Sequence, residues 1–307
     1  MKDFISIADF STQQLRVLLE RALADKKLFA AGQLPARCQG KTLALIFEKP
    51  SLRTRVSFEA AITQLGGGAI YLSDQDIGLG KREAVKDVAR VLGRMCDAIA
   101  ARTFSHEAVV ELARHSACPV INALTDYSHP CQAMADILTA KEALGRLHGR
   151  TLAFIGDGNN VARSLATLCV KLGMHFVLAC PEGFELEPDF VAALAEAGEG
   201  SYRQTNQPLQ AVEQASIIYT DTWVSMGQDA EKADRQAAFQ AFQVNADLLA
   251  AAPRDAIVMH CLPAYRGCEI TDEVMEAHAQ TIFAEAENRL HFQRSLLNVL
   301  MCEGGIP

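Results

Sequence analysis

The chain has 307 residues, of which 50% are hydrophobic and 21% are charged, and its formal net charge is −8 at pH 7. This length suits two domains of roughly 150 residues, each with an ordinary hydrophobic core. Lysine and arginine form no dense cluster, so the acidic chain is not expected to bind nucleic acid. No apolar run approaches the roughly 18 residues that a membrane helix needs, so we expect no membrane association.

The start of the chain and its cysteines predict a cytoplasmic protein. Residues 1–5 lack the basic segment and apolar core of a secretory signal. Nine cysteines are scattered from Cys38 to Cys302, and none forms a Cys-x-x-Cys pair. This pattern predicts reduced thiols, with neither a disulfide framework nor a zinc site.

The first half of the chain alternates short apolar runs with helical segments, which is typical of an α/β protein with a parallel sheet. The predicted strands are Thr42–Phe47, Ala69–Leu72, Ala98–Ala101 and Pro119–Ala123. The predicted helices include Arg55–Leu65 and Glu83–Met95, and a helix over Ala133–Leu147 leads into the second half.

The second half repeats the scheme. The predicted strands are Thr151–Ile155, Met174–Ala179, Ser216–Thr220 and Ala256–His260, and the predicted helices include Ala162–Lys171, Pro188–Ala197 and Glu285–Met301. We predict two doubly wound parallel-sheet domains, residues 1–148 and 149–285, with residues 286–307 packing back on the first. Ligands of such sheets bind beyond the carboxyl ends of the strands, so the active site is expected in the cleft between the domains.

The segment after the first predicted strand has the features of a phosphate site. It reads Ser51-Leu52-Arg53-Thr54-Arg55, and Ser51 is placed to cap the following helix. Free backbone N–H groups, two hydroxyls and Arg53 would together hold an anion. The alternative is an ordinary capped helix with solvated arginines.

Two other strand ends contribute polar residues. Arg102 follows the third strand, and His129 opens a His-Pro-Cys-Gln run that ends at Gln132. Taken alone, Arg102 could be structural and His129 a packing group. Because three strand ends converge in a parallel sheet, we expect these residues to meet Arg53 and Thr54 around one small anion.

The strand ends of the second domain carry different chemistry. Gly156-Asp157-Gly158-Asn159-Asn160-Val161 follows a strand but lacks the third glycine of a dinucleotide fingerprint. This turn is expected to offer Asn160 to a ligand, with nicotinamide binding as the alternative. Asp221 suits a cationic amine or, alternatively, caps the next helix. Cys261, taken alone, reads as a buried hydrophobic residue.

These motifs together resemble the aspartate/ornithine carbamoyltransferase family. The resemblance is carried by Ser-x-Arg-Thr-Arg from Ser51, His-Pro-Cys-Gln from His129, Asp221 with Ser225-Met226-Gly227, His260-Cys261-Leu262-Pro263-Ala264, and Glu287-Asn288-Arg289. Cysteine in the third place of His-Pro-Cys-Gln is similar to the ornithine branch, whereas the aspartate branch usually has threonine there. The motifs agree in order and spacing from about Phe4 to Leu300.

The resemblance implies transfer of a carbamoyl group from carbamoyl phosphate to the side-chain amine of L-ornithine, giving L-citrulline and phosphate, in arginine synthesis or in reverse. It also implies a homotrimer or a multiple of it, and neither a cofactor nor a metal. The residues implied to bind carbamoyl phosphate are Ser51, Leu52, Arg53, Thr54, Arg102, His129, Gln132, Cys261, Leu262 and Arg289. Those implied to bind ornithine are Asn160, Asp221, Ser225 and Met226.

The reaction requires a neutral amine and donors for the oxygen that gains charge. Arg102, His129 and Thr54 are assigned to that oxygen, and Cys261 is counted with them as catalytic. Three alternative functions stay open. They are a carbamoyltransferase for putrescine or N-acetylornithine, a nicotinamide-dependent dehydrogenase, and a catalytically silent homologue.

One departure from the family pattern lies in the loop after the second strand. Many members have a glutamine before a Leu-Gly or Ile-Gly pair, and this chain has Gly78 in that place. The resemblance implies that this loop reaches the phosphate of a neighbouring subunit. Lys81 or Arg82 is the candidate replacement for the missing contact.

Overall fold

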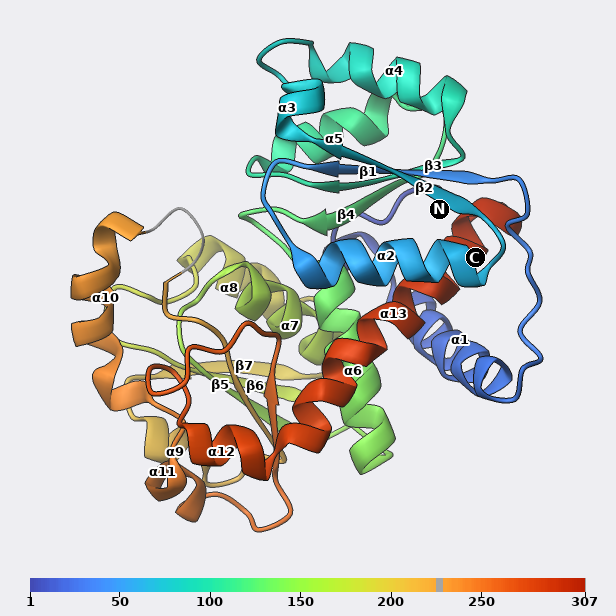
Figure 1. Cartoon of the computed structure of the whole chain (residues 1–307). Coiled ribbons are helices and arrows are strands. Elements are labelled where there is room, and N and C mark those ends of the chain that lie inside the picture. The colour runs from blue at the N-terminus through green and yellow to red at the C-terminus, as the bar shows by residue number, and fades with distance from the viewer. Residues whose placement is uncertain (225–228, 307) are drawn as a thin grey trace. The chain divides into compact units, whose positions relative to one another are not determined.

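A computed structural model describes residues 1–224 and 229–306 of the chain. The chain forms two compact units, one of Met1–Leu138 with Glu287–Pro307 and the other of Thr139–Ala286. We call them unit 1 and unit 2. Each contains one parallel sheet with helices between its strands, as the sequence predicted (Figure 1).

The sheet of unit 1 has the strand order β2-β1-β3-β4, and all of its pairs are parallel. Its strands are β1 (Thr42–Phe47), β2 (Gly68–Ser73), β3 (Ala98–Arg102) and β4 (Val120–Leu124). The helices of this part of the chain are η1 (Ile7–Asp9), α1 (Thr12–Ala30), α2 (Leu52–Gln64), α3 (Asp74–Ile77), α4 (Val85–Met95), α5 (His106–His115) and α6 (Pro130–Leu144).

Alternate residues of the central strands of unit 1 face opposite sides of the sheet. Ala44 and Ile46 of β1 share a buried cluster with Val88 of α4 and Leu112 of α5. Figure 1 shows α4 and α5 on this face and α2 on the other. Because both faces are covered, the strands read as nearly continuous apolar runs, which made them predictable.

The sheet of unit 2 has the strand order β7-β6-β5-β8-β9, again parallel. Its strands are β5 (Thr151–Ile155), β6 (His175–Ala179), β7 (Ser201–Thr205), β8 (Ile217–Thr220) and β9 (Ile257–His260). The remaining helices are α7 (Asn160–Lys171), α8 (Pro188–Ala195), α9 (Pro208–Val212), η2 (Asp229–Glu231), α10 (Lys232–Phe239), η3 (Gln240–Phe242), α11 (Ala246–Ala250), α12 (Asp272–Ala277) and α13 (Ala279–Cys302).

Strand β7 was not predicted from the sequence. It lies at the edge of the sheet, and its residues Ser201, Arg203 and Gln204 are exposed. An edge strand of polar composition carries neither an apolar run nor a clean alternation, so no periodic signal marked it. The other eight strands lie within one residue of their predicted bounds.

The division between the units falls inside two helices. Leu138 and Thr139 are consecutive residues of α6, and Ala286 and Glu287 are consecutive residues of α13. The sequence placed the first division after this helix, at His148, because glycine and polar residues follow it there. A helix that continues from one unit into the next has no break in its periodicity where the units divide.

Crossing a lipid bilayer requires a long and apolar helix, and none of the helices within residues 1–224 and 229–306 has both properties.

The aromatic centre of unit 2 provides a test of its packing. Phe154 is fully buried and stacks on Tyr219 with ring centroids 5.3 Å apart. We expect Phe154→Ala to lower the free energy of unfolding by about 3–5 kcal/mol, because it leaves a cavity that the rigid sheet cannot fill. Urea denaturation followed by circular dichroism measures this change. Phe283→Ala, at an exposed position, is the control, and equal effects of the two variants would contradict this account.

Candidate active site

The start of α2 presents polar groups, as the sequence predicted. Ser51 caps the helix by accepting a hydrogen bond from the Thr54 backbone N–H at 3.3 Å. Its hydroxyl donates to Thr54 Oγ1 at 2.9 Å. Leu52 and Arg53 lie in the first turn of the helix, where backbone N–H groups point along the axis and the helix dipole favours negative charge. The predicted cap is therefore confirmed.

The hydroxyl of Thr54 is a meeting point for two arginines from other elements. Arg102, the last residue of β3, donates from Nη1 to Thr54 Oγ1 at 3.3 Å. Arg289, on α13, donates from Nη2 to the same oxygen at 2.5 Å. All three residues belong to unit 1 and are buried. The structure thus brings together Thr54, Arg102 and Arg289, three of the residues that the resemblance implied for carbamoyl phosphate.

The positive charges of this cluster oppose one another. Burial, together with the positive charges of Arg289 and Arg53, lowers the pKa of Arg102 to about 9. Concentrating guanidinium groups in a buried place is unfavourable because their charges repel one another. An anion bound at the start of α2 would relieve this repulsion.

His129 and Gln132 lie at the start of α6. Both are buried, and burial holds the pKa of His129 well below its usual 6.5, with the charges of Arg289 and Arg102 adding to the effect. His129 is therefore a neutral imidazole near pH 7. Gln132 donates from Nε2 to Asp136 Oδ1 at 2.7 Å, a contact that the sequence reading missed.

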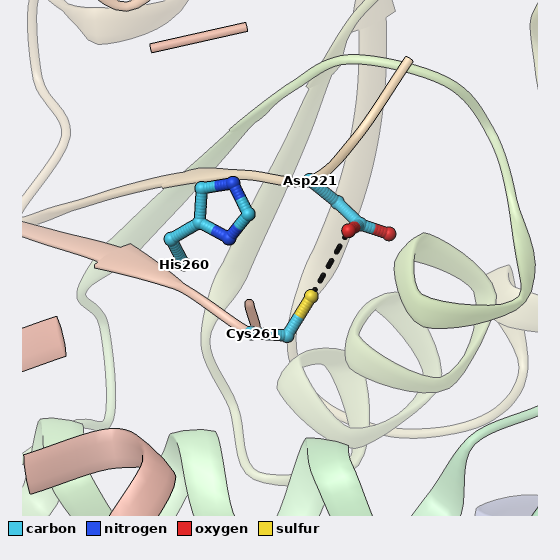
Figure 2. Close-up of side chains that lie close together, drawn as sticks. All are labelled: Asp221, His260 and Cys261. Atoms are coloured by element: carbon cyan, nitrogen blue, oxygen red, sulfur yellow. Dashed lines mark hydrogen bonds between the residues drawn. The ribbon is translucent and has the colours of Figure 1, made fainter. Parts of the chain in front are cut away.

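A second polar cluster lies in unit 2, at the ends of β8 and β9. Cys261 follows β9, and its thiol donates to Asp221 Oδ1 at 3.1 Å, as Figure 2 shows. The other oxygen of Asp221 accepts from Asn159 Nδ2 at 2.9 Å. Asn159 also caps α7, accepting hydrogen bonds from Val161 N and Ala162 N. The sequence predicted that Asn160 contacts a ligand, and it did not predict the contact of Asn159 with Asp221.

His260 supports this cluster from behind. Its Nδ1 accepts a hydrogen bond from the Leu262 backbone N–H at 2.9 Å, so its Nε2 carries the proton and faces Glu269 Oε1 at 3.1 Å. Leu262 has a φ of 60°, a left-handed conformation that is unfavourable for a side chain and is often found at functional sites. The His260 contact holds the backbone there.

Asp221, His260 and Cys261 also offer three potential metal ligands whose ligand atoms lie within 4.8 Å of one another (Figure 2). Both ring nitrogens of His260 are already engaged, one with Leu262 and one with Glu269. Metal binding would require breaking one of these hydrogen bonds, so the arrangement fits a hydrogen-bonded support better than a metal site.

The backbone of residues 184–186 packs directly against Gly158 in the turn after β5. Gly158 N donates to Phe184 O at 2.8 Å, and a side chain at Gly158 would meet the backbone of Glu185 and Leu186 at 2.8 Å. In a dinucleotide site the corresponding close approach serves a pyrophosphate. The nicotinamide alternative therefore gains no support. Two further predicted residues, Ser225 and Met226, lie outside the described residues.

The loop at Gly78 forms a tight turn. Gly78 ends α3 with a φ of 57°, and a Cβ there would lie 2.8 Å from the Cβ of Arg82. A glutamine could not take this position without a change in the backbone. The neighbouring Lys81 and Arg82 are both exposed.

Comparison with known proteins agrees with this geometry. Residues 2–142 match the carbamoyl-P binding domain of aspartate/ornithine carbamoyltransferases, and residues 148–300 match the Asp/Orn binding domain. The chloroplastic ornithine carbamoyltransferase of Pisum sativum is 48% identical over 298 residues, which cover 97% of this chain and 80% of the relative. An ornithine carbamoyltransferase of Pyrococcus furiosus described as anabolic is 45% identical over 309 residues, which cover 99% of this chain and 96% of the relative.

A solved structure of ornithine carbamoyltransferase from Pyrococcus furiosus superposes with a TM-score of 0.94 at 44% identity, covering 100% of this chain and 98% of that chain. Sequence and fold therefore agree along nearly the whole length of the chain. The chain belongs to the aspartate/ornithine carbamoyltransferase family.

Proposed function

We propose that this protein is an ornithine carbamoyltransferase, which transfers the carbamoyl group of carbamoyl phosphate to the side-chain amine of L-ornithine. The products are L-citrulline and phosphate. The observation that carries this proposal is the convergence of Arg102 and Arg289 on Thr54 at the start of a helix, which fits a phosphorylated donor. A role in arginine biosynthesis is supported by the relative described as anabolic.

In this proposal unit 1 holds the phosphate and the carbonyl of the donor. Ser51, Leu52 and Arg53 bind the phosphate through backbone N–H groups, a hydroxyl and a guanidinium. The other donor-binding residues of unit 1 are Thr54, Arg102, His129, Gln132 and Arg289, and the family resemblance implies Cys261 and Leu262 of unit 2 as well. The cap geometry at Ser51 and the buried position of Thr54 support these roles, because they leave the donor groups fixed before the ligand arrives.

The chemical step needs positive charge and hydrogen-bond donors around the carbonyl oxygen. As the amine attacks the carbon, the carbonyl oxygen gains negative charge and the C–O bond to phosphate then breaks. Arg102, with Thr54, lies where the buried positive charge is concentrated. His129 is neutral and can donate one hydrogen bond without adding a further charge. The departing phosphate accepts the proton of the amine.

Asp221 supplies the argument for the acceptor. Its carboxylate is buried and hydrogen-bonded by the uncharged groups Asn159 and Cys261. A buried carboxylate surrounded by neutral donors attracts a cation, and the α-ammonium of ornithine is such a cation. Asn160, Ser225 and Met226 complete the proposed ornithine site, with the last two outside the described residues.

A homotrimer, or a multiple of it, is the proposed assembly. Leu52 and Val56 of α2 and Ile70 of the edge strand β2 have apolar side chains that are 74%, 53% and 49% exposed. Exposed apolar side chains on one helix and an adjoining sheet edge support contact with a second copy. The cytoplasm is the proposed compartment, which the nine free thiols support.

The function is tested by a citrulline assay with carbamoyl phosphate and four acceptors: L-ornithine, putrescine, N-acetylornithine and aspartate. We expect activity with ornithine to exceed that with each other amine by at least about tenfold. Putrescine has no carboxylate, and acetylation removes the ammonium that Asp221 would meet. Higher kcat/KM with putrescine or N-acetylornithine would replace the proposed acceptor, and no carbamoylated product with any amine would refute the activity.

Arginine substitutions test the donor site. We expect Arg53→Ala and Arg102→Ala each to lower kcat/KM. The expected loss of transition-state stabilisation is about 2–4 kcal/mol, which is the scale of one lost oxyanion contact. Arg90→Ala is the control, since Arg90 is an exposed cation of the same unit that pairs with Asp87. Losses below threefold for both site variants would contradict the assignment.

Asp221→Asn tests the acceptor site, because it removes the charge and keeps the size of the side chain. With carbamoyl phosphate present, we expect the Kd for ornithine to rise at least about tenfold, since a hydrogen bond to a charged group contributes roughly 1.5–3 kcal/mol. Isothermal titration calorimetry measures this, with Asp255→Asn at an exposed position as the control. Unchanged affinity for ornithine would exclude the role of Asp221.

A further inference from the structure

Gln132 and Asp136 form a fully internal pair on α6. They lie one helical turn apart, with 0% and 1% of their surfaces exposed. Gln132 Nε2 donates to Asp136 Oδ1 at 2.7 Å. Such an i,i+4 contact links two side chains on one face of a helix. This contact determines the orientation of the Gln132 amide.

A carboxylate only accepts hydrogen bonds, whereas an amide has one donating and one accepting end. Asp136 therefore holds the NH₂ group of Gln132, and the Oε1 atom must point the other way. Within the described residues, Oε1 is buried and has no hydrogen-bond partner. A buried acceptor of this kind is rare in folded proteins and calls for a donor from elsewhere.

The surroundings indicate where that donor comes from. Gln132 lies in the first turn of α6, three residues after His129. Strand β4, which precedes α6, pairs with β3 so that Leu124 lies beside Arg102. The unsatisfied oxygen therefore belongs to the same part of unit 1 as the arginine cluster around Thr54.

We propose that Asp136 is a positioning residue that makes the donor site selective for a carbamoyl group, by fixing Gln132 with its oxygen toward the bound donor. The inference rests on the proposed use of carbamoyl phosphate. The carbamoyl NH₂ donates to Oε1. Acetyl phosphate shares the phosphate and the carbonyl but carries a methyl group instead, so its binding leaves Oε1 buried and unsatisfied.

Asp136→Asn removes the constraint and nearly preserves volume. An asparagine amide can meet either end of the Gln132 amide, so Gln132 can turn over and present its NH₂ group to the ligand. That group repels a carbamoyl NH₂ and tolerates a methyl group no worse than Oε1 does. The variant should therefore lose preference for the carbamoyl group rather than lose binding of the phosphate.

The experiment measures citrulline formation with acetyl phosphate as a competitive inhibitor against carbamoyl phosphate. The readout is the ratio of Ki for acetyl phosphate to KM for carbamoyl phosphate. We expect this ratio to be at least about 10 in the wild type, because bound acetyl phosphate leaves one buried acceptor unsatisfied. In Asp136→Asn it should fall by at least about fivefold, through a higher KM with little change in Ki.

Two further variants separate positioning from packing. Gln132→Met removes the acceptor directly and should lower the ratio in the same way, and adding Asp136→Asn to it should change the ratio no further. Asp136→Glu keeps a group that only accepts and should retain a higher ratio than Asp136→Asn. If Asp136→Asn does not fold by circular dichroism, the comparison of Asp136→Glu with Gln132→Met decides.

Thr139→Ser is the control for general disturbance of α6, since Thr139 is buried on the same helix. A parallel rise of KM and Ki in Asp136→Asn, with the ratio unchanged, would overturn the proposal, as would equal ratios in Asp136→Glu and Gln132→Met. Absence of citrulline formation by the wild type is a different result, because it refutes the proposed function itself.

Discussion

The arrangement of unit 1 depends on the gathering of positive charge around one buried hydroxyl. Arg102 and Arg289 come from different elements and both donate to Thr54, although their charges and that of Arg53 repel one another. Packing of β3, α2 and α13 must hold these groups together against that repulsion. Positive groups that are already in place can stabilise an anion without reorganising, which is the basis of electrostatic catalysis.

Unit 2 shows the opposite arrangement. Its central charge is the carboxylate of Asp221, which is stabilised by the neutral donors Asn159 and Cys261. His260 and Glu269 then fix the backbone at Leu262, one residue beyond the thiol. One unit thus carries groups suited to a phosphorylated anion and the other a group suited to an ammonium, which matches the two substrates of a carbamoyl transfer.

The neutral side chains of His129 and Gln132 give the site a selectivity that its positive charge alone cannot provide. A cluster of arginines attracts many small phosphates, because charge alone does not distinguish an amino group from a methyl group. His129 remains neutral under the influence of nearby positive charges, and Gln132 is oriented by Asp136. Neutral groups with a fixed orientation can distinguish ligands by their hydrogen-bond donors and acceptors, whereas charged groups mainly distinguish ligands by net charge.

The sequence by itself determined the parallel α/β organisation, eight of the strands, the cap at Ser51 and the family motifs, because these depend on local periodicity and on residues close in the chain. It missed β7, an exposed edge strand with polar residues. Only the tertiary structure decided that Arg289 donates to Thr54, 235 residues away, that Asn159 donates to Asp221, and that Gln132 donates to Asp136. Packing and side-chain rotamers set these contacts, and no local pattern in the sequence encodes them.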